Sequence, residues 1–215
     1  ISGEATYSAA DKAQLLRPLG ISVTDFRLDF FSEEKDQIYA NNLFKKFGVA
    51  EKDFVVSLSP VSRQPYKVWP AERFGQVADW LIEKYSAKIL FLFGPGEKHF
   101  VESVRALMKM PALPDYGVPT LTETLSILKR VDLHLGNDNG IRHFAVAANT
   151  PSLAIFGRPW AANWTPPKPT RHHALEYDPG CKKKCVYPKC ELECLKGINV
   201  EAVKSELEIV INNLN

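Results

Sequence analysis

The sequence has no long apolar run. None of its stretches approaches the roughly 20 consecutive apolar residues that a helix needs to span a bilayer. The N-terminus also lacks the basic segment followed by an apolar one that marks a secretory signal peptide. These two absences argue against an integral membrane protein and against a secreted one, and they predict a cytoplasmic protein.

The sequence also has little net charge. Its 27 lysines and arginines exceed its 25 aspartates and glutamates only slightly, which gives a formal net charge of +2. A protein whose binding to nucleic acid rests on phosphate contacts normally carries a much larger basic excess. We therefore expect no nucleic-acid partner, and we expect any anionic ligand to be met by a local group of basic side chains.

No methionine opens the chain, which begins "ISGEATYSAADKAQ". This absence predicts a fragment of a longer protein. We find no internal repeat and no low-complexity segment. Of the 215 residues 45% are hydrophobic, which is enough to fill the core of one large domain or of one domain with an appendage.

Four short apolar runs that end at Pro or Gly predict buried strands. They are "DFVVSLSP" (53–60), "AKILFLFG" (87–94), "VDLHLG" (131–136) and "PSLAIFG" (151–157). Continuous apolar runs of this length are typical of parallel strands that are covered on both faces. Helical patterns lie between them, so the sequence predicts an α/β fold with a parallel sheet and helices on both faces.

The helical patterns have recognisable starts. Pro70 precedes an apolar stripe with three- and four-residue spacing, and Thr120 with Glu123 forms a capping box before a second helix. "GIRHFAVAAN" (140–149) reads as a short helix packed close to the sheet. The apolar stripe that follows Pro70 comprises Phe74, Val77, Ala78, Leu81, Ile82 and Tyr85.

The two ends of the chain contain helices and no predicted strands. Helices are expected in 8–20 and 32–48, each ending at a glycine, and from Asn199 to the C-terminus. The predicted inward side chains are Ile38, Leu43, Phe44 and Phe47, and then Val200, Val203, Leu207, Val210 and Leu214. We expect residues 1–50 to be a linker with helices and residues 51–215 to form the α/β domain.

The loops after the predicted strands carry groups that suit a phosphate ligand. In open α/β sheets, ligands bind outside the carboxyl ends of the strands. Arg63 and Lys67 follow the first strand, Glu97 follows the second, and "NDNGIRH" (137–143) follows the third. The backbone amides at 139–141 lie where a helix begins, and helix N-termini attract anions. The sequence predicts a diphosphate site at this edge.

Each feature also has a purely structural interpretation. The Asn-Asp-Asn-Gly turn could be only a helix cap, "GPGE" is short of a full glycine-rich motif, and Lys67 could be a solvated loop lysine. Trp69 fits a core aromatic. His134 alternates with leucines and fits a structural role in a strand, whereas His172 and His173 are expected in a surface loop.

An ordered set of motifs resembles a known family. The motifs are Lys-x-Trp-Pro at 67–70, Gly-x-x-Glu at 94–97, Asn-Asp-x-Gly-x-x-His at 137–143 and a strand that ends Phe-Gly at 156–157. Together, over about 53–167, they resemble the C-terminal, donor-binding half of glycosyltransferase family nine, the lipopolysaccharide heptosyltransferases. This resemblance implies a GT-B architecture, in which two Rossmann-like domains face each other and the second binds a nucleotide-sugar.

The resemblance also implies roles for individual residues. Lys67 would contact the donor's phosphate or sugar, Glu97 the ribose or base, and Asp138 the sugar hydroxyls. Asn139 and Gly140 would offer amides to the diphosphate, and His143 would lie within reach of it. Members usually carry Ser or Thr where this chain has Asn139, and a smaller or uncharged residue where it has Arg142. The arginine could contact phosphate or point to solvent. Arg63 is a further candidate phosphate contact.

The implied chemistry needs no metal. Fixed amides and cations can stabilise the charge on a leaving diphosphate, and the sequence has no Asp-x-Asp metal motif. The donor implied is a nucleotide-sugar such as ADP-heptose, and the acceptor is the lipopolysaccharide core or another surface glycan. The family's acceptor-binding domain and its general base do not fit before residue 53, so we expect a fragment with no catalytic base of its own, acting at the inner face of the bacterial membrane.

Two other functions stay open. A non-catalytic module could use the same fold to bind a nucleotide-sugar, a metal or a partner protein, and the upstream reading frame would separate this from the first hypothesis. A nucleotide-sugar epimerase of the same architecture is a narrower alternative, although its acid and base residues are not evident in the sequence.

Four cysteines lie close together in 181–194. Cys181, Cys185, Cys190 and Cys194 have the spacing Cys-x3-Cys-x4-Cys-x3-Cys, which differs from the paired Cys-x-x-Cys of common zinc sites. Free thiols, a zinc site and disulfides are the alternatives, in that order of preference for a reducing cytoplasm. Lysines lie among them at 182–184 and 189, where they form a solvated face or meet an anionic headgroup.

Overall fold

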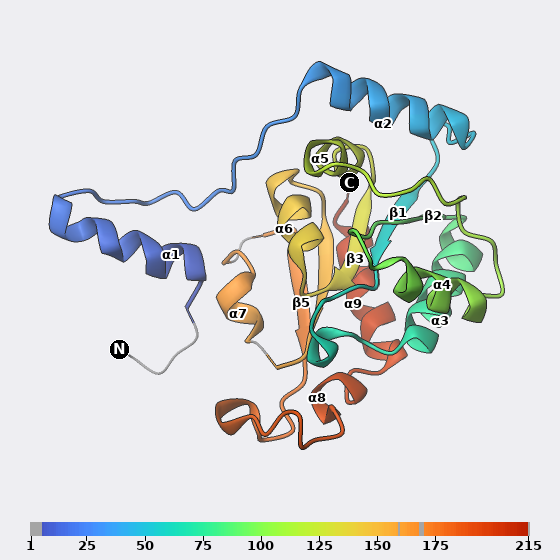
Figure 1. Cartoon of the computed structure of the whole chain (residues 1–215). Coiled ribbons are helices and arrows are strands. Elements are labelled where there is room, and N and C mark those ends of the chain that lie inside the picture. Colours follow the sequence, from blue (N-terminus) through green and yellow to red (C-terminus); the bar gives the residue numbers. More distant parts are fainter. Residues whose placement is uncertain (1–5, 159, 168–169, 215) are drawn as a thin grey trace.

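A five-stranded parallel sheet forms the centre of the molecule (Figure 1). The structure, a computed structural model, describes residues 6–158, 160–167 and 170–214. The strands are β1 (Val55–Ser59), β2 (Lys88–Phe91), β3 (Leu133–Asn137), β4 (Ser152–Phe156) and β5 (His172–Glu176). Their order across the sheet is β2-β1-β3-β4-β5. The predicted α/β fold with a parallel sheet is confirmed.

The strand order creates a switch point. The chain leaves β1 to form β2 on one side, and it then returns to form β3 on the other side of β1. The loops that follow β1 and β3 therefore diverge, and a crevice opens between them at the carboxyl ends of the strands. The four predicted strands are confirmed, and β1, β3 and β4 are buried along their whole length because helices cover both of their faces.

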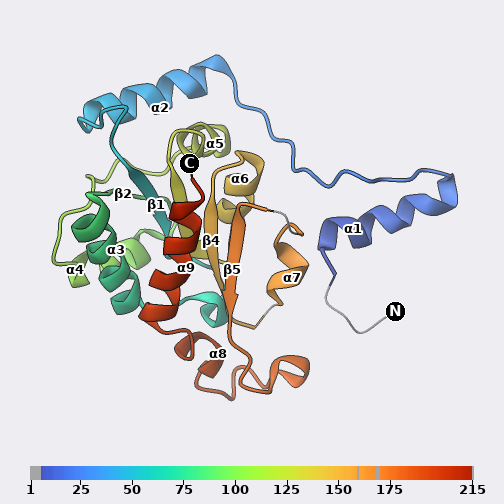
Figure 2. The ribbon, with the colours of Figure 1, turned by 180° about the vertical axis from the view of Figure 1, so that it is seen from behind.

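Helices cover both faces of the sheet. The face shown in front in Figure 2 is covered by α3 and α9. Together with α4 and α8, they form a hydrophobic cluster with strand side chains such as Leu58 and Leu133. The other face packs on α2, α5 and α6 through residues such as Leu90 and Ala145. The bounds are α2 (Glu34–Lys46), α3 (Ala71–Tyr85), α4 (Lys98–Leu107), α5 (Leu121–Leu128), α6 (Gly140–Ala147), α8 (Glu193–Lys196) and α9 (Val200–Asn212).

The predicted helix starts agree with the structure. Pro70 is the N-cap residue of α3, and Thr120 with Glu123 forms the expected capping box before α5. Asn199 caps α9 by accepting a hydrogen bond from the Ala202 amide at 2.8 Å. Of the predicted inward side chains, Val200, Val203, Leu207 and Val210 pack in the core as expected, whereas Leu214 lies beyond the end of α9. Ile38 of α2 is 50% exposed, so that prediction is wrong. Its place in the apolar face is taken by Ala40, which is fully buried.

The N-terminal segment extends away from the sheet (Figure 1). It contains α1 (Ser8–Ala13) and the 3-10 helix η1 (Gln14–Leu19), neither of which has a buried residue. Further along, α2 packs on α5, and the Thr122 hydroxyl donates a hydrogen bond to Asp36 at 3.1 Å. A domain boundary at residue 50 stays a prediction, and α2 shares the core of the sheet.

One strand and three helices have no clear sequence signal. The strand β5 and the helices α4, α7 (Ala161–Trp164) and α8 were not expected. The expectation that His172 and His173 lie in a surface loop is wrong. His172 is buried in β5, and His173 pairs with Glu206 of α9.

A polar row crosses four neighbouring strands. Ser57, His134, Ser152 and His172 occupy matching positions in β1, β3, β4 and β5. The Ser57 hydroxyl lies 2.9 Å from His134 Nδ1, and the Ser152 hydroxyl lies 3.0 Å from His172 Nδ1. The structural role predicted for His134 fits this arrangement. Burial lowers the pKa of His134 to about 3 and that of His172 to about 4.

The two buried histidines predict a pH-dependent stability. In the unfolded chain a histidine gains a proton near pH 6.5, whereas in the folded protein both histidines stay neutral until the pH is far lower. The contribution of these two histidines to the free energy of unfolding is therefore fully present above about pH 7. It is lost as the pH falls from about 6.5 toward the folded pKa values. At pH 5 we expect a loss of about 2 kcal/mol for each histidine, because each pH unit contributes about 1.4 kcal/mol.

Urea unfolding at pH 7.5 and pH 5.0 measures this loss. His172→Gln is expected to reduce the loss of stability between these two pH values by about 2 kcal/mol, and His99→Gln, at an exposed position, is the matched control. If the free energy of unfolding depends on pH equally in the His172 variant and in the unaltered chain, protonation of His172 does not destabilise the folded protein.

Candidate functional site

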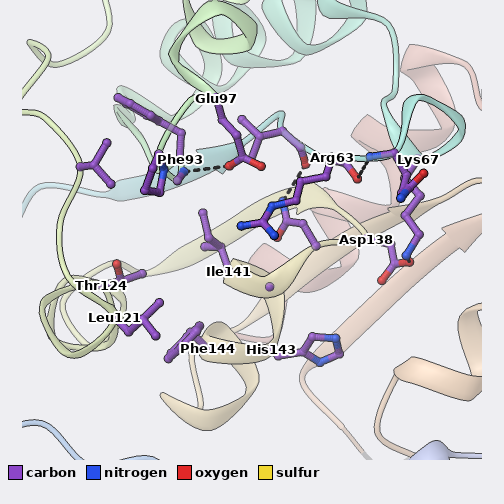
Figure 3. A pocket seen from close by; sticks show the side chains of 18 of the residues that line it. Arg63, Lys67, Phe93, Glu97, Leu121, Thr124, Asp138, Ile141, His143 and Phe144 are labelled. Carbon is purple, nitrogen blue, oxygen red and sulfur yellow. Dashed lines mark hydrogen bonds and ion pairs between the residues drawn. The ribbon is translucent and has the colours of Figure 1, made fainter.

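A cavity of about 570 Å³ opens at the carboxyl ends of β1, β2 and β3 (Figure 3). This volume is within the range of small-molecule sites. Its walls come from the loop after β1, the loop after β2 and the first turn of α6, with further contributions from 118–124 and from Trp164. The cavity therefore lies at the switch point of the sheet, where the topology places a ligand.

One end of the cavity is apolar. It is lined by Phe93, Val118, Leu121, Ile141 and Phe144. Figure 3 shows Leu121 and Phe144 together at the side of the cavity away from Lys67. A flat aromatic group would lose water-exposed apolar area in this end, and such burial is favourable by roughly 25 cal/mol per Å².

The other end carries an ion pair. Lys67 Nζ lies 2.6 Å from Asp138 Oδ2, and the side chain of Asp138 is only 4% exposed. Although the two groups touch, Asp138 Oδ2 has no hydrogen-bond partner with favourable geometry among the described residues, so the contact is a charge pair. Lys67, whose side chain is 23% exposed, is therefore the accessible partner.

The loop that bears Lys67 is tied to the end of β3. The Trp69 amide donates a hydrogen bond to Asn137 Oδ1 at 3.1 Å, and the Trp69 indole donates to the Ile198 carbonyl at 2.9 Å. Trp69 is fully buried, as the sequence predicted for a core aromatic. The Lys-x-Trp-Pro motif thus anchors the loop through its tryptophan and presents its lysine to the cavity.

The first turn of α6 faces the cavity. Asn139 is the N-cap residue: its side chain accepts from the Arg142 amide at 3.1 Å and donates to Ser59 Oγ at 2.8 Å. The carboxamide is thus used to hold the turn on β1. The amides of Gly140 and Ile141 have no partner within the helix, because a helix leaves its first N–H groups unpaired. They lie where a helix dipole favours an anion.

Glu97 and Arg63 also line the cavity (Figure 3). Glu97 Oε2 accepts a hydrogen bond from the Gly94 amide at 2.8 Å, which closes the turn after β2. A carboxylate has several lone pairs, so Glu97 retains capacity to accept from a ligand hydroxyl. The Arg63 side chain is exposed at the rim.

His143 is half-buried on α6, beside Lys67 and Asp138. Burial, with a further effect of the charge on Arg142, lowers its pKa below the usual value. The ring is therefore neutral at pH 7 and acts through one N–H donor and one acceptor. It lies edge-on to Trp164, with ring centroids 5.7 Å apart.

Arg142 lies in neither of the positions expected from the sequence. Its side chain is completely buried, so the exposed position is wrong, and it is absent from the described residues that line the cavity. The guanidinium donates to the Trp164 carbonyl and, at 2.9 Å, to Thr165 Oγ1, and it lies over the Phe156 ring. Burial lowers its pKa to about 10, so Arg142 stays charged at neutral pH.

The four cysteines line a second cavity, which is only about 10 Å³. All four thiols are free, and burial raises the pKa of Cys194. Within the described part of the chain, no group of three or more histidine, cysteine or acidic side chains has an arrangement that would hold a metal ion. The prediction that the lysine run is solvated is wrong for Lys182, which is buried, pairs with Glu176 and lies over the Trp160 ring.

The structure thus gathers Lys67, Glu97, Asp138 and the start of α6 around one cavity, with Arg63 at its rim. Two parts of the cavity had no signal in the sequence. The stretch 118–124 is recognisable only as a helix start, and Trp164 lies in no motif. In the described residues, no helix is both long and apolar enough to cross a membrane.

Known proteins share both the sequence pattern and the fold. The chain is 28% identical over 189 residues to lipopolysaccharide heptosyltransferase 3 of Escherichia coli K12, a match that covers 78% of this chain and 53% of that protein. The chain therefore spans about half the length of this curated relative.

Solved structures show the fold. A glycosyl transferase family 9 protein from Veillonella parvula aligns with a TM-score of 0.84 and 23% identity, covering 98% of this chain and 61% of that one. E. coli heptosyltransferase WaaC with ADP-2-deoxy-2-fluoro heptose aligns with a TM-score of 0.57 and 17% identity, covering 90% and 52%. The fold thus agrees with that of a part of these longer chains.

A family model also matches most of the chain. The model for glycosyltransferase family 9 (heptosyltransferase) matches residues 11–195, which include the sheet, the cavity and the first three motifs as well as the Phe-Gly end of β4. The chain belongs to glycosyltransferase family 9.

Proposed function

We propose that this chain is the donor-binding part of a heptosyltransferase and that the cavity holds ADP-heptose. One observation carries the proposal: a single cavity at the switch point joins an apolar end to an end with an accessible lysine and a helix N-terminus. A nucleotide-sugar has this same division, with a flat base at one end and a charged diphosphate next to its sugar.

The donor is arranged along the cavity as follows. Its base lies between Phe93, Leu121 and Phe144, and its ribose hydroxyls donate to Glu97. The diphosphate lies against Lys67 and the amides at the start of α6. ADP is favoured over other nucleotides because WaaC, a structural neighbour, has been solved with an ADP-heptose analogue. The sugar then lies beside Asp138 and His143, beyond the diphosphate.

This arrangement accounts for how the protein promotes the transfer of the sugar. Transfer breaks the bond between the sugar and the diphosphate, and negative charge builds up on the leaving ADP. Lys67 and the helix amides are fixed where that charge develops, which is the usual source of large electrostatic catalysis. Asp138 holds Lys67 in place through their ion pair before the donor arrives. Its second role is to accept hydrogen bonds from sugar hydroxyls.

In this proposal, the acceptor is bound, and the catalytic base supplied, by a part of the protein outside this chain. We propose a lipopolysaccharide acceptor by analogy with the curated relative, and a general base from an acceptor-binding domain outside this chain. Since such an acceptor is a membrane lipid, the proposed place of action is the cytoplasmic face of the inner membrane.

Calorimetric titration with ADP, UDP and GDP tests the donor site. We expect saturable binding of ADP with one site per chain, and about tenfold weaker binding of UDP and GDP, in keeping with the ADP-sugar held by the structural neighbour. Circular dichroism on the same sample checks that the chain is folded. A folded chain that binds none of the three at millimolar concentration would overturn the proposal.

A further inference from the structure

A short helix closes the charged end of the cavity. It is α7, which follows β4 and ends at Trp164. The Trp164 side chain lines the cavity and is 36% exposed, in contrast to Trp69, which is fully buried. Its indole N–H donates to no described residue, so a face and an edge of the ring are available to a ligand.

Charged side chains hold α7 at both of its ends. At its C-terminal end, Arg142 donates to the Trp164 carbonyl and to Thr165 Oγ1. At its N-terminal end, the Ala161 amide donates to Glu176 Oε2 at 2.9 Å, and Glu176 pairs with the buried Lys182. Taking a guanidinium out of water is costly, and a buried arginine needs charge-assisted hydrogen bonds in return. Here those bonds go to the backbone and side chain at the end of α7.

The position of the ring along the cavity follows from His143. The two rings are 5.7 Å apart, and Figure 3 shows His143 on the side of Asp138 and Lys67, away from Leu121. Trp164 therefore lies at the opposite end from the apolar pocket that fits a base. A donor whose base fills that pocket and whose diphosphate meets Lys67 places its sugar next to Trp164.

We propose that Trp164 is the stacking surface for the sugar of the donor and that Arg142 is the residue that positions it. This inference rests on the proposed function of the cavity. A sugar ring presents a face of C–H groups, which gains by burial against an aromatic ring. Its equatorial hydroxyls project from the edge of the ring, toward Asp138 and His143. The aromatic face and the carboxylate thus recognise two different sides of one sugar.

Two affinities measured on each variant separate the sugar contact from the nucleotide contact. The probes are ADP and ADP-heptose, titrated by calorimetry into the unaltered chain, Trp164→Ala and Trp164→Phe. In Trp164→Ala we expect unchanged affinity for ADP and a loss of about fivefold for ADP-heptose, in line with the strength of aromatic contacts. Trp164→Phe keeps an aromatic face and is expected to retain most of the affinity.

Arg142→Lys tests the positioning role. Lysine keeps the charge but cannot donate to the Trp164 carbonyl and Thr165 together. We expect this variant to lose affinity for ADP-heptose and to keep its affinity for ADP, which a general loss of folding would not produce. Steady-state fluorescence on addition of ADP-heptose should change in the unaltered chain and lose that response in Trp164→Phe.

The outcomes distinguish the two levels of the argument. If Trp164→Ala binds ADP and ADP-heptose as the unaltered chain does, the stacking surface is wrong while the donor site stands. If the unaltered chain binds ADP and ADP-heptose with equal affinity, the inference is also wrong. If it binds neither ligand, the proposed function fails and this inference fails with it.

Discussion

Replacing Lys67 with alanine is expected to weaken the binding of ADP by about tenfold to a hundredfold while the chain stays folded. A hydrogen bond to a charged group contributes about 1.5–3 kcal/mol, and here the loss has a second part. Asp138 is 4% exposed and loses its only ion-pair partner among the described residues. The unpaired, buried carboxylate would then repel the diphosphate.

The effect of leaving Asp138 unpaired makes a distinctive prediction for a double variant. Asp138→Asn removes the negative charge at nearly the same volume, so Lys67→Ala with Asp138→Asn should bind ADP more tightly than Lys67→Ala alone. For ADP-heptose, Asp138→Asn and Asp138→Ala are each expected to weaken binding, because the sugar hydroxyls lose a charged acceptor. The measurement is again calorimetric titration, with thermal unfolding as the check on folding.

Lys84→Ala is the matched control for the loss of a lysine. Lys84 forms an ion pair with Glu208 on the surface, and both side chains are more than 40% exposed at 47% and 42%. Exposed pairs contribute little to stability, so this variant should bind ADP as the unaltered chain does. Equal affinity in Lys67→Ala and Lys84→Ala would remove Lys67 from the phosphate site.

The sheet was predictable where burial left a mark on the sequence. β1, β3 and β4 are covered on both faces, so each is a continuous apolar run between turn residues. β5 lies at the edge of the sheet and reads "HHALE", with exposed Glu176 at its end. Its strand character comes from its register with β4, and no local apolar pattern indicates it.

The site was predictable in part for a similar reason. Lys67, Glu97, Asp138 and Gly140 follow predicted strands, and the topology of a parallel sheet brings such loops together. The ion pair between Lys67 and Asp138 joins loops that are far apart in the sequence, so no local spacing indicates it.

Arg142 shows why local patterns can mislead. Arginine is almost always exposed, and its position in the first turn of a helix near a phosphate site favours a ligand contact. Its actual partners are 22 and 23 residues further along the chain, at Trp164 and Thr165. Only the packing of α7 on the sheet brings these groups together.

Replacing Gly157 with alanine is expected to destabilise the fold by about 3 kcal/mol and to weaken ADP binding as well. Gly157 directly follows β4, and a Cβ atom there would lie 2.3 Å from the Tyr66 carbonyl oxygen and 3.1 Å from the Leu195 side chain. A contact of 2.3 Å with backbone cannot be relieved by a side-chain rotation. The backbone at Tyr66 must therefore move, and Tyr66 immediately precedes Lys67.

Gly75→Ala separates this effect from the general cost of adding a methyl group. Gly75 is buried in α3, and its added Cβ would lie 3.4 Å from the Leu107 backbone, which is an ordinary contact. Alanine is favoured over glycine within a helix by about 1 kcal/mol, so this variant should be as stable as the unaltered chain or more so. Urea unfolding and ADP titration on both variants give the comparison. If Gly157→Ala unfolds at the same urea concentration as Gly75→Ala and binds ADP equally well, the loop that carries Lys67 tolerates displacement, and the close packing of Gly157 on Tyr66 has no part in forming the donor site.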